Sequence, residues 1–199
     1  MIVISWIVAL AWGYLIGSIP FGVLVTRFAG EGDIRQVGSG NIGATNVLRT
    51  GRKDLAAITL VGDAGKGAVA VIAAQLMFHN PAITAAAGAA AFLGHLFPVW
   101  LKFQGGKGVA TFFGIMLAAA WPAGLLAAAT WIAIAFLFRI SSLAALVAAS
   151  LAPVFVLVTD QPRPFSFLAL CMAVLIFLRH HENIRRLLKG EEPRIGKKA

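Results

Sequence analysis

Charged residues are scarce in this sequence. Of its 199 residues, 13% are charged and 59% are hydrophobic, whereas soluble globular domains have about 25% charged and roughly 45–50% apolar residues. So low a charge content excludes an ordinary soluble domain. The sequence therefore indicates an integral membrane protein.

The chain is also poor in residues that form disulfides and metal sites. Its one cysteine, Cys171, cannot form an intramolecular disulfide, and we expect it to pack inside an apolar helix. The histidines lie at positions 79, 95, 180 and 181. Adjacent residues on a helix diverge by about 100°, so this spacing does not favour metal ligation. We expect no metal and no cofactor.

Long apolar runs dominate the chain. Spans are predicted at 2–28, 54–78, 82–101, 109–120, 122–138, 141–158 and 164–179. The first is longer than the roughly 7–15 apolar residues of a signal peptide, so we expect a retained helix. The run 109–120 would cover about 18 Å of a hydrocarbon core about 30 Å thick, which leaves its crossing open. We predict an all-α integral membrane fold, a compact bundle of about seven transmembrane helices that forms one domain over residues 1–199.

The basic residues predict the orientation of this bundle. With seven crossings and the N-terminus outside, every Lys and Arg except Arg163 and Lys66 falls on one face, including Lys197 and Lys198 of the tail. Cytoplasmic loops are the ones that carry an excess of Lys and Arg. We therefore place the C-terminus and three polar clusters on the cytoplasmic side.

The first polar cluster is rich in glycine. It contains Gly38, Ser39, Gly40, Asn41, Gly43, Thr45, Asn46 and Arg49. Glycine admits positive φ, which lets successive backbone N–H groups turn toward one anion. The spacing also fits nucleotide-binding patterns, but no strand precedes it and Ala44-Thr45 stand where a P-loop has Lys and Ser or Thr. We expect this loop to bind phosphate, and we expect no nucleotide and no nucleic acid.

The second and third clusters add cations and a histidine pair. Gly105, Gly106, Lys107 and Gly108 come directly before an apolar run, which suits an anion site at a helix N-terminus. In the third cluster, His180 and Asn183 are spaced i and i+3, so that they can face one pocket. The basic residues that follow could instead form a surface that contacts anionic lipid.

Three further polar residues each allow a structural and a functional interpretation. Asp63 and Lys66 are spaced i and i+3 inside the second predicted span. Charges at that depth are costly, and the pair could either neutralise itself or line the polar site. His95, near the end of the third span, could be a structural residue or a hydrogen-bond donor to substrate.

The three clusters together resemble one family, the acyl-phosphate:glycerol-3-phosphate acyltransferases of bacterial membranes known as PlsY. The resemblance covers essentially the whole chain, in motifs that run from Gly38 to Arg49, Gly94 to Thr111 and Arg179 to Glu191. It implies transfer of a fatty acyl group from acyl phosphate to the 1-hydroxyl of glycerol 3-phosphate. The products would be lysophosphatidic acid, a membrane lipid, and phosphate. The family also implies a location in the bacterial cell membrane.

The motifs suggest a role for each group of residues in that reaction. We expect Ser39 and the glycine-loop amides to hold a phosphate, Arg49 and Lys107 to neutralise phosphate charge, and His180 with Asn183 to orient glycerol phosphate. By similarity, Ser141 or Ser142 also contacts substrate. The oligomeric state cannot be inferred from this pattern. A phosphate or organophosphate transporter is the alternative, although it would need polar groups and access on both faces.

Overall fold

The computed structural model describes residues 2–196, and all the regular secondary structure over that range is helical. Lys197 and Lys198, counted among the tail cations, lie outside the described residues. The chain divides into two compact units, Met1–Ala119 and Ala120–Ala199. The expectation of a single domain stays a prediction.

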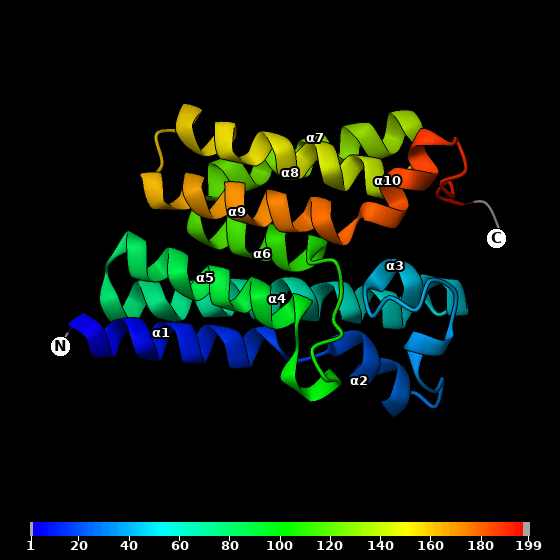
Figure 1. The fold of residues 1–199 in the computed structure, drawn as a ribbon, viewed down its shortest axis with the longest axis horizontal. Coiled ribbons are helices and arrows are strands. Elements are labelled where there is room, and N and C mark those ends of the chain that lie inside the picture. The colour runs from blue at the N-terminus through cyan, green and yellow to red at the C-terminus, as the bar shows by residue number, and fades with distance from the viewer. Residues whose placement is uncertain (1, 197–199) are drawn as a thin grey trace. The chain divides into compact units, whose positions relative to one another are not determined.

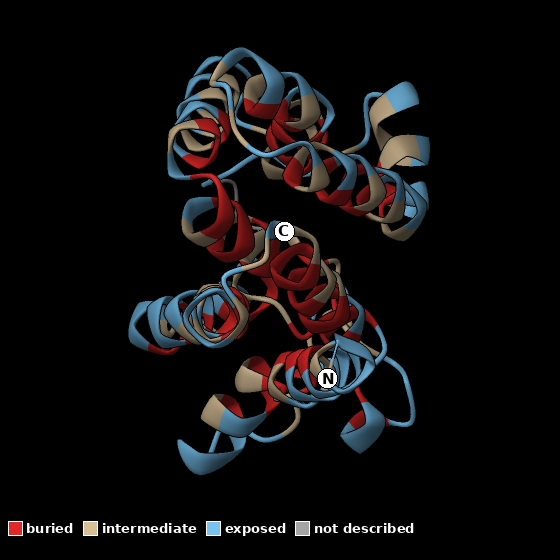
Figure 2. Cartoon of the chain, turned by 90° about the vertical axis from the view of Figure 1, so that its left-hand side faces the viewer, coloured by how far each residue is buried: buried red, intermediate tan, exposed pale blue. Residues whose placement is uncertain are grey.

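Over residues 2–119, the first unit holds three long apolar segments and the shorter helix α6, joined by loops and short helices. Its elements are α1 (Ile2–Gly17), α2 (Phe21–Phe28), η1 (Ile34–Gln36), α3 (Ala44–Val47), η2 (Leu48–Thr50), α4 (Lys53–Phe78), α5 (Pro81–Leu96), η3 (Val99–Leu101) and α6 (Val109–Ala119). Helix α4 contacts α1, α5 and α6, and α1 also packs along α5 (Figure 1). Within the unit, the buried residues follow the faces where these helices meet (Figure 2).

Small residues bring these helices into backbone contact. A Cβ at Gly13 or Gly17 of α1 would overlap the carbonyl of Ala87 or Ala91 of α5, and one at Gly94 would overlap the backbone of α1. In lipid, where no hydrophobic effect drives helices together, such close approach supplies the packing energy.

Up to residue 196, the second unit contains four helices. They are α7 (Trp121–Phe138), α8 (Ser141–Val158), α9 (Arg163–Arg179) and α10 (His181–Leu188). Helix α8 packs against α7 and α9 through an alanine-rich buried face. Cys171 lies half-buried in α9. The segment after α10 returns to the α7–α8 turn, where Ile195 N–H donates a 2.6 Å hydrogen bond to the carbonyl of Arg139.

The predicted spans are close to the observed helices. In the part of the chain that the structure describes, five segments are long and apolar enough to cross a membrane, α9 and α10 make a sixth if the pair is taken as one span across its 65° bend, and α6 is a shorter apolar helix. The all-α membrane fold is thus confirmed, with a helix count near the predicted seven. The stretch 2–28 is not one helix, because Pro20 lacks an N–H group and disfavours helical geometry in the residue before it. The chain accordingly breaks between Gly17 and Phe21.

Candidate functional site

The glycine-rich loop of the first unit has the backbone geometry that its sequence predicts. Gly38 and Gly40 have φ of 54° and 70°, in the left-handed region that glycine adopts without a steric penalty. The side chain of Asn41 accepts a 3.1 Å hydrogen bond from Gly43 N–H, which tightens the turn into α3. These features make the loop a compact structure, unlike a flexible connector.

The buried side chain of Asn46 connects several parts of this loop by hydrogen bonds. It is 2% exposed, and its Nδ2 donates to the carbonyls of Ile34, Val37 and Asn41 at 3.1, 2.9 and 2.8 Å. Its Oδ1 accepts hydrogen bonds from the backbone N–H and the hydroxyl of Ser39. The structure therefore gives Asn46 a shaping role within the loop, beyond the phosphate contact expected from its position.

Other polar side chains of the loop lie on its exposed side. Ser39, Thr45 and Arg49 are all exposed. The Arg49 side chain lies against Gly38, because a Cβ at that glycine would meet its Cδ at 2.7 Å and Nη1 at 2.9 Å. A hydroxyl and a guanidinium group beside left-handed backbone turns are donors suited to a phosphate.

Ion pairs fix the segment that leads into this loop. Asp33 contacts Arg27 at 2.7 Å and Arg35 at 2.6 Å, and its carboxylate also accepts from Arg35 N–H at the start of η1. The hydrogen bond from the Arg35 side chain, aided by Arg27, holds the pKa of Asp33 well below its usual range. This carboxylate therefore contacts both arginines and offsets one of their two positive charges.

The second loop lies directly before α6. The backbone N–H groups of Gly105 and Gly106 donate to the carbonyls of Leu96 and His95 at 3.1 and 3.2 Å. A Cβ on Gly106 would overlap the His95 imidazole, and Gly108 has φ of 84°. Lys107 is half-buried between these glycines, two residues before α6 begins at Val109. The loop thus places a cation at a helix N-terminus, as its sequence predicts.

The ion pair predicted inside the second span is present in α4. Lys66 Nζ lies 2.7 Å from Asp63 Oδ1, and each side chain is 2% exposed. Lys66 also donates a 2.7 Å hydrogen bond to the carbonyl of Ile19. His95 Nδ1 lies 3.5 Å from the same Asp63 oxygen. Asp63, Lys66 and His95, for each of which the sequence allows a structural or a functional role, therefore form one buried group.

In the second unit, the α9–α10 bend positions the histidine and asparagine of the third cluster. His180 caps α9 and is 3% exposed, and Asn183 is 8% exposed. His180 Nδ1 lies 2.8 Å from the carbonyl of Ile176. A carbonyl only accepts, so Nδ1 carries the proton and Nε2 is the acceptor nitrogen.

Glu192 is a residue of this unit that sequence reasoning missed. Its carboxylate accepts hydrogen bonds from the Ser142 hydroxyl at 2.7 Å, the Asn183 amide, and Arg186 Nε at 2.6 Å. Burial acts to raise the pKa of Glu192, but the hydrogen bonds from Asn183, Ser142 and Arg186 outweigh it and lower that pKa. The sequence gives only a weak indication of this contact, a glycine at 190 two residues before the acid. In the structure Gly190 has φ of 72°, and the chain turns back there.

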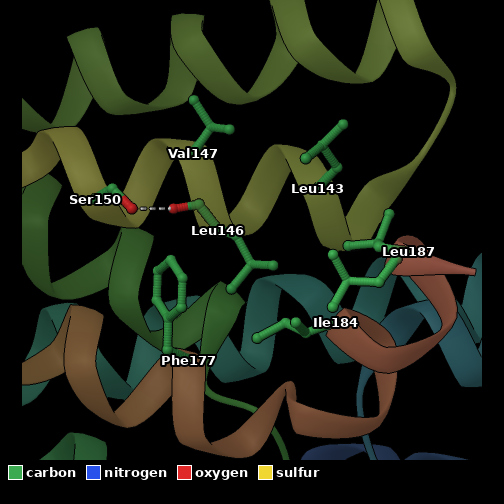
Figure 3. Close-up of a pocket in the computed structure, with 8 residues that line it drawn as sticks. Leu143, Leu146, Val147, Ser150, Phe177, Ile184 and Leu187 are labelled. Atoms are coloured by element: carbon green, nitrogen blue, oxygen red, sulfur yellow. Dashed lines mark hydrogen bonds between the residues drawn. The ribbon is translucent and has the colours of Figure 1, made fainter.

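An apolar groove of about 410 Å³ adjoins α10 in the same unit (Figure 3). Helices α8, α9 and α10 line it with Leu143, Leu146, Val147, Ser150, Phe177, Ile184, Leu187 and Leu188. The Ser150 hydroxyl donates to the carbonyl of Leu146 and so adds little polarity. The lining of the groove is therefore almost entirely apolar.

The predicted site residues are divided between the two units. The first unit holds the glycine loop with Ser39 and Arg49, the Lys107 loop, and the Asp63 group. The second holds Ser141 at the start of α8, together with Ser142, His180 and Asn183. Within residues 2–196, no three His, Cys, Asp or Glu side chains gather closely enough to hold a metal ion.

Comparison with known proteins gives consistent matches along the chain. A family model described as glycerol-3-phosphate acyltransferase matches residues 7–190. A glycerol-3-phosphate acyltransferase of Caulobacter vibrioides (strain NA1000 / CB15N) is 72% identical over 192 residues, which cover 96% of this chain and 88% of the relative. A second, from Cereibacter sphaeroides (strain ATCC 17025 / ATH 2.4.3), is 58% identical over 187 residues, which cover 94% of this chain and 88% of the relative.

Two solved structures are similar as well. The crystal structure of PlsY, an integral membrane glycerol 3-phosphate acyltransferase, in its glycerol 3-phosphate form has a TM-score of 0.91 and 38% identity and covers 96% of each chain. The lysophosphatidic acid form has a TM-score of 0.89 and 36% identity over the same shares.

Proposed function

The chain belongs to the glycerol-3-phosphate acyltransferase family, and from that premise we propose that it uses acyl phosphate as its acyl donor. The acceptor is the 1-hydroxyl of sn-glycerol 3-phosphate. The hydroxyl oxygen forms a bond to the acyl carbon, the bond from that carbon to the phosphate oxygen breaks, and phosphate leaves. The products are lysophosphatidic acid and phosphate, so the reaction begins phospholipid synthesis.

The observation that carries this proposal is the pair of glycine loops in the first unit. One presents Ser39 and Arg49 on its exposed side, and the other presents Lys107 at the start of α6. Both substrates carry phosphate, and both loops offer a cation beside backbone turns that only glycine adopts readily. We assign phosphate binding to these loops and the orientation of glycerol phosphate to His180 and Asn183.

The proposed donor explains why a dedicated base is unnecessary. Acyltransferases with a His-x-x-x-x-Asp motif use the histidine as a base, but here Thr84, Trp100, Arg185 and Arg186 stand five residues after the histidines. Acyl phosphate is already activated, and its leaving phosphate can accept the hydroxyl proton. Positioning and charge neutralisation then supply the catalysis.

The apolar groove and the charge distribution fit a membrane substrate. One substrate and one product carry a long acyl chain, which requires access to lipid. The basic loops favour the cytoplasmic face of a bacterial inner membrane. We propose that the N-terminus lies outside and the C-terminus in the cytoplasm.

Purified protein in detergent should make lysophosphatidic acid from acyl phosphate and glycerol 3-phosphate. The reaction should proceed with a chelator present and without nucleotide. A requirement for acyl-CoA, acyl carrier protein or a divalent cation would contradict the proposed donor.

The role of Lys107 can be distinguished from that of an exposed lysine outside the two loops. Lys107→Ala should lose most turnover, and Lys107→Arg should recover part of it, because guanidinium keeps the charge but changes donor geometry. Lys53→Ala, at the exposed first residue of α4, is the matched control and should stay near wild type. Normal rates for Lys107→Ala would reject the assigned role.

A further inference from the structure

The buried group around Asp63 contains more than an isolated ion pair. Lys66 Nζ contacts both the Asp63 carboxylate and the Ile19 carbonyl at 2.7 Å. His95 is a third ionisable residue, 3.5 Å from that carboxylate and 3% exposed. Replacing a buried ion pair by apolar residues is often neutral or stabilising, so stability alone does not account for these charges.

On one side, the group holds the break between α1 and α2. Pro20 has no N–H group, and the Ile19 carbonyl accepts only a long 3.2 Å hydrogen bond from Phe21 N–H within the backbone. In a membrane segment each backbone polar group needs a partner inside the protein. Lys66 supplies one, which ties α4 to the break.

On the other side, the group reaches the loop that carries Lys107. The His95 ring lies so close to Gly106 that a Cβ there would overlap Nε2. The His95 carbonyl accepts from Gly106 N–H at 3.2 Å. Ring and backbone of one residue therefore both contact the loop, while Nδ1 faces Asp63 on the opposite edge of the ring.

We propose that Asp63 and Lys66 are positioning residues for acyl transfer, which act through His95 on the loop at 105–108. The Asp63 carboxylate, 3.5 Å from His95 Nδ1, favours the proton on that nitrogen, which leaves the Nε2 edge toward the loop. Lys66 fixes Asp63 and anchors the pair to the helix break. The inference rests on the proposed function for its kinetic consequence, but its structural content is independent of that function.

A double variant separates positioning from mutual neutralisation. Asp63→Asn and Lys66→Met alone each leave a buried charge unpaired and should lower the thermal midpoint in detergent. The double variant removes both charges and should regain the part of the midpoint that the unpaired charge costs, while the Ile19 carbonyl still lacks the Lys66 donor. If the residues position His95, kcat/KM for glycerol 3-phosphate should nevertheless stay at least about tenfold below wild type, the lower end of the loss seen when the partner that orients a metal-bound histidine is removed.

The controls cover folding and the intermediate residue. Thr59→Val, which is buried on the same helix and bonds only to the Leu55 carbonyl, should match wild type in midpoint and rate. His95→Gln should reproduce the kinetic loss without a loss of midpoint. Recovery of kcat/KM together with the midpoint in the double variant would overturn the proposal.

A spectroscopic test needs only wild-type protein and His95→Gln for assignment. With ¹⁵N-labelled imidazoles at mildly alkaline pH, His95 should show a protonated Nδ1. An unprotonated Nδ1 would overturn the inference, whatever the variants do. Failure of the proposed function would appear separately, as wild-type protein that makes no lysophosphatidic acid.

Discussion

Asn46→Asp tests whether one buried amide organises the glycine loop. The substitution keeps the size of the side chain but replaces the Nδ2 donor, which serves three carbonyls at 2.8–3.1 Å, with an oxygen that those carbonyls repel. Two N–H hydrogens are shared among the three acceptors, so we count about two to three net hydrogen bonds at about 1 kcal/mol each. A loss of about 2–3 kcal/mol lowers the ratio of ordered to disordered loop by roughly 30- to 150-fold.

The effect should be local. Hydrogen exchange of residues 38–43 should accelerate, and KM for glycerol 3-phosphate should rise by at least about tenfold, while the helices keep their protection because their packing does not involve this amide. Asn80→Asp is the matched control, since its side chain only accepts hydrogen bonds, from Ala82 and Ile83 N–H. Unchanged exchange at 38–43 would refute the structural reasoning. Rapid exchange with a normal KM would refute the role of the loop in phosphate binding.

Three other predictions concern the second loop, the topology and Glu192. Gly106→Ala should lose most activity because the added Cβ would overlap the His95 ring. Gly65→Ala on α4 should stay active, since its Cβ would meet no atom of another element within 4 Å. Equal rates for the two variants would contradict this account. Cysteine at the exposed position of Gln36 should react with a membrane-impermeant thiol reagent only from the cytoplasm, and one at Gln161 only from outside; the reverse pattern would reject the orientation. Because the pKa of Glu192 is lowered on folding, its contribution is present above its ordinary value of 4.5 and is lost as pH falls through the lowered pKa. The thermal midpoint of Glu192→Gln should lack that acid dependence, and an unchanged midpoint profile would refute it.

The helices were predictable because membrane thickness imposes a length on every apolar segment. The limits of α4, α7 and α8 differ from the predicted spans by no more than a residue at each end. The break in the first span was not predicted, although Pro20 was visible. At this break, the Ile19 carbonyl accepts a hydrogen bond from Lys66, which lies 47 residues further along the chain. Local sequence carries no information about a contact of that range.

The site was predictable in its residue types and less so in their arrangement. Glycines and cations mark both loops, but nothing in the sequence distinguishes buried Asn46 from exposed Ser39 and Thr45. Glu192 was missed because its partner Ser142 lies 50 residues away. Contacts of that range depend on how the chain folds back, and hydrophobic periodicity carries no information about them.

The backbone contact between α1 and α5 bears on how this protein can diverge. At Gly13, Gly17 and Gly94 any side chain would meet the neighbouring backbone, so these positions tolerate only glycine unless the helices move apart. Exposed residues of α1, such as Leu10 and Leu15, have no such steric limit and can change in size with the lipids of the host. One helix therefore combines positions that are nearly fixed with positions that can vary freely from one membrane to another.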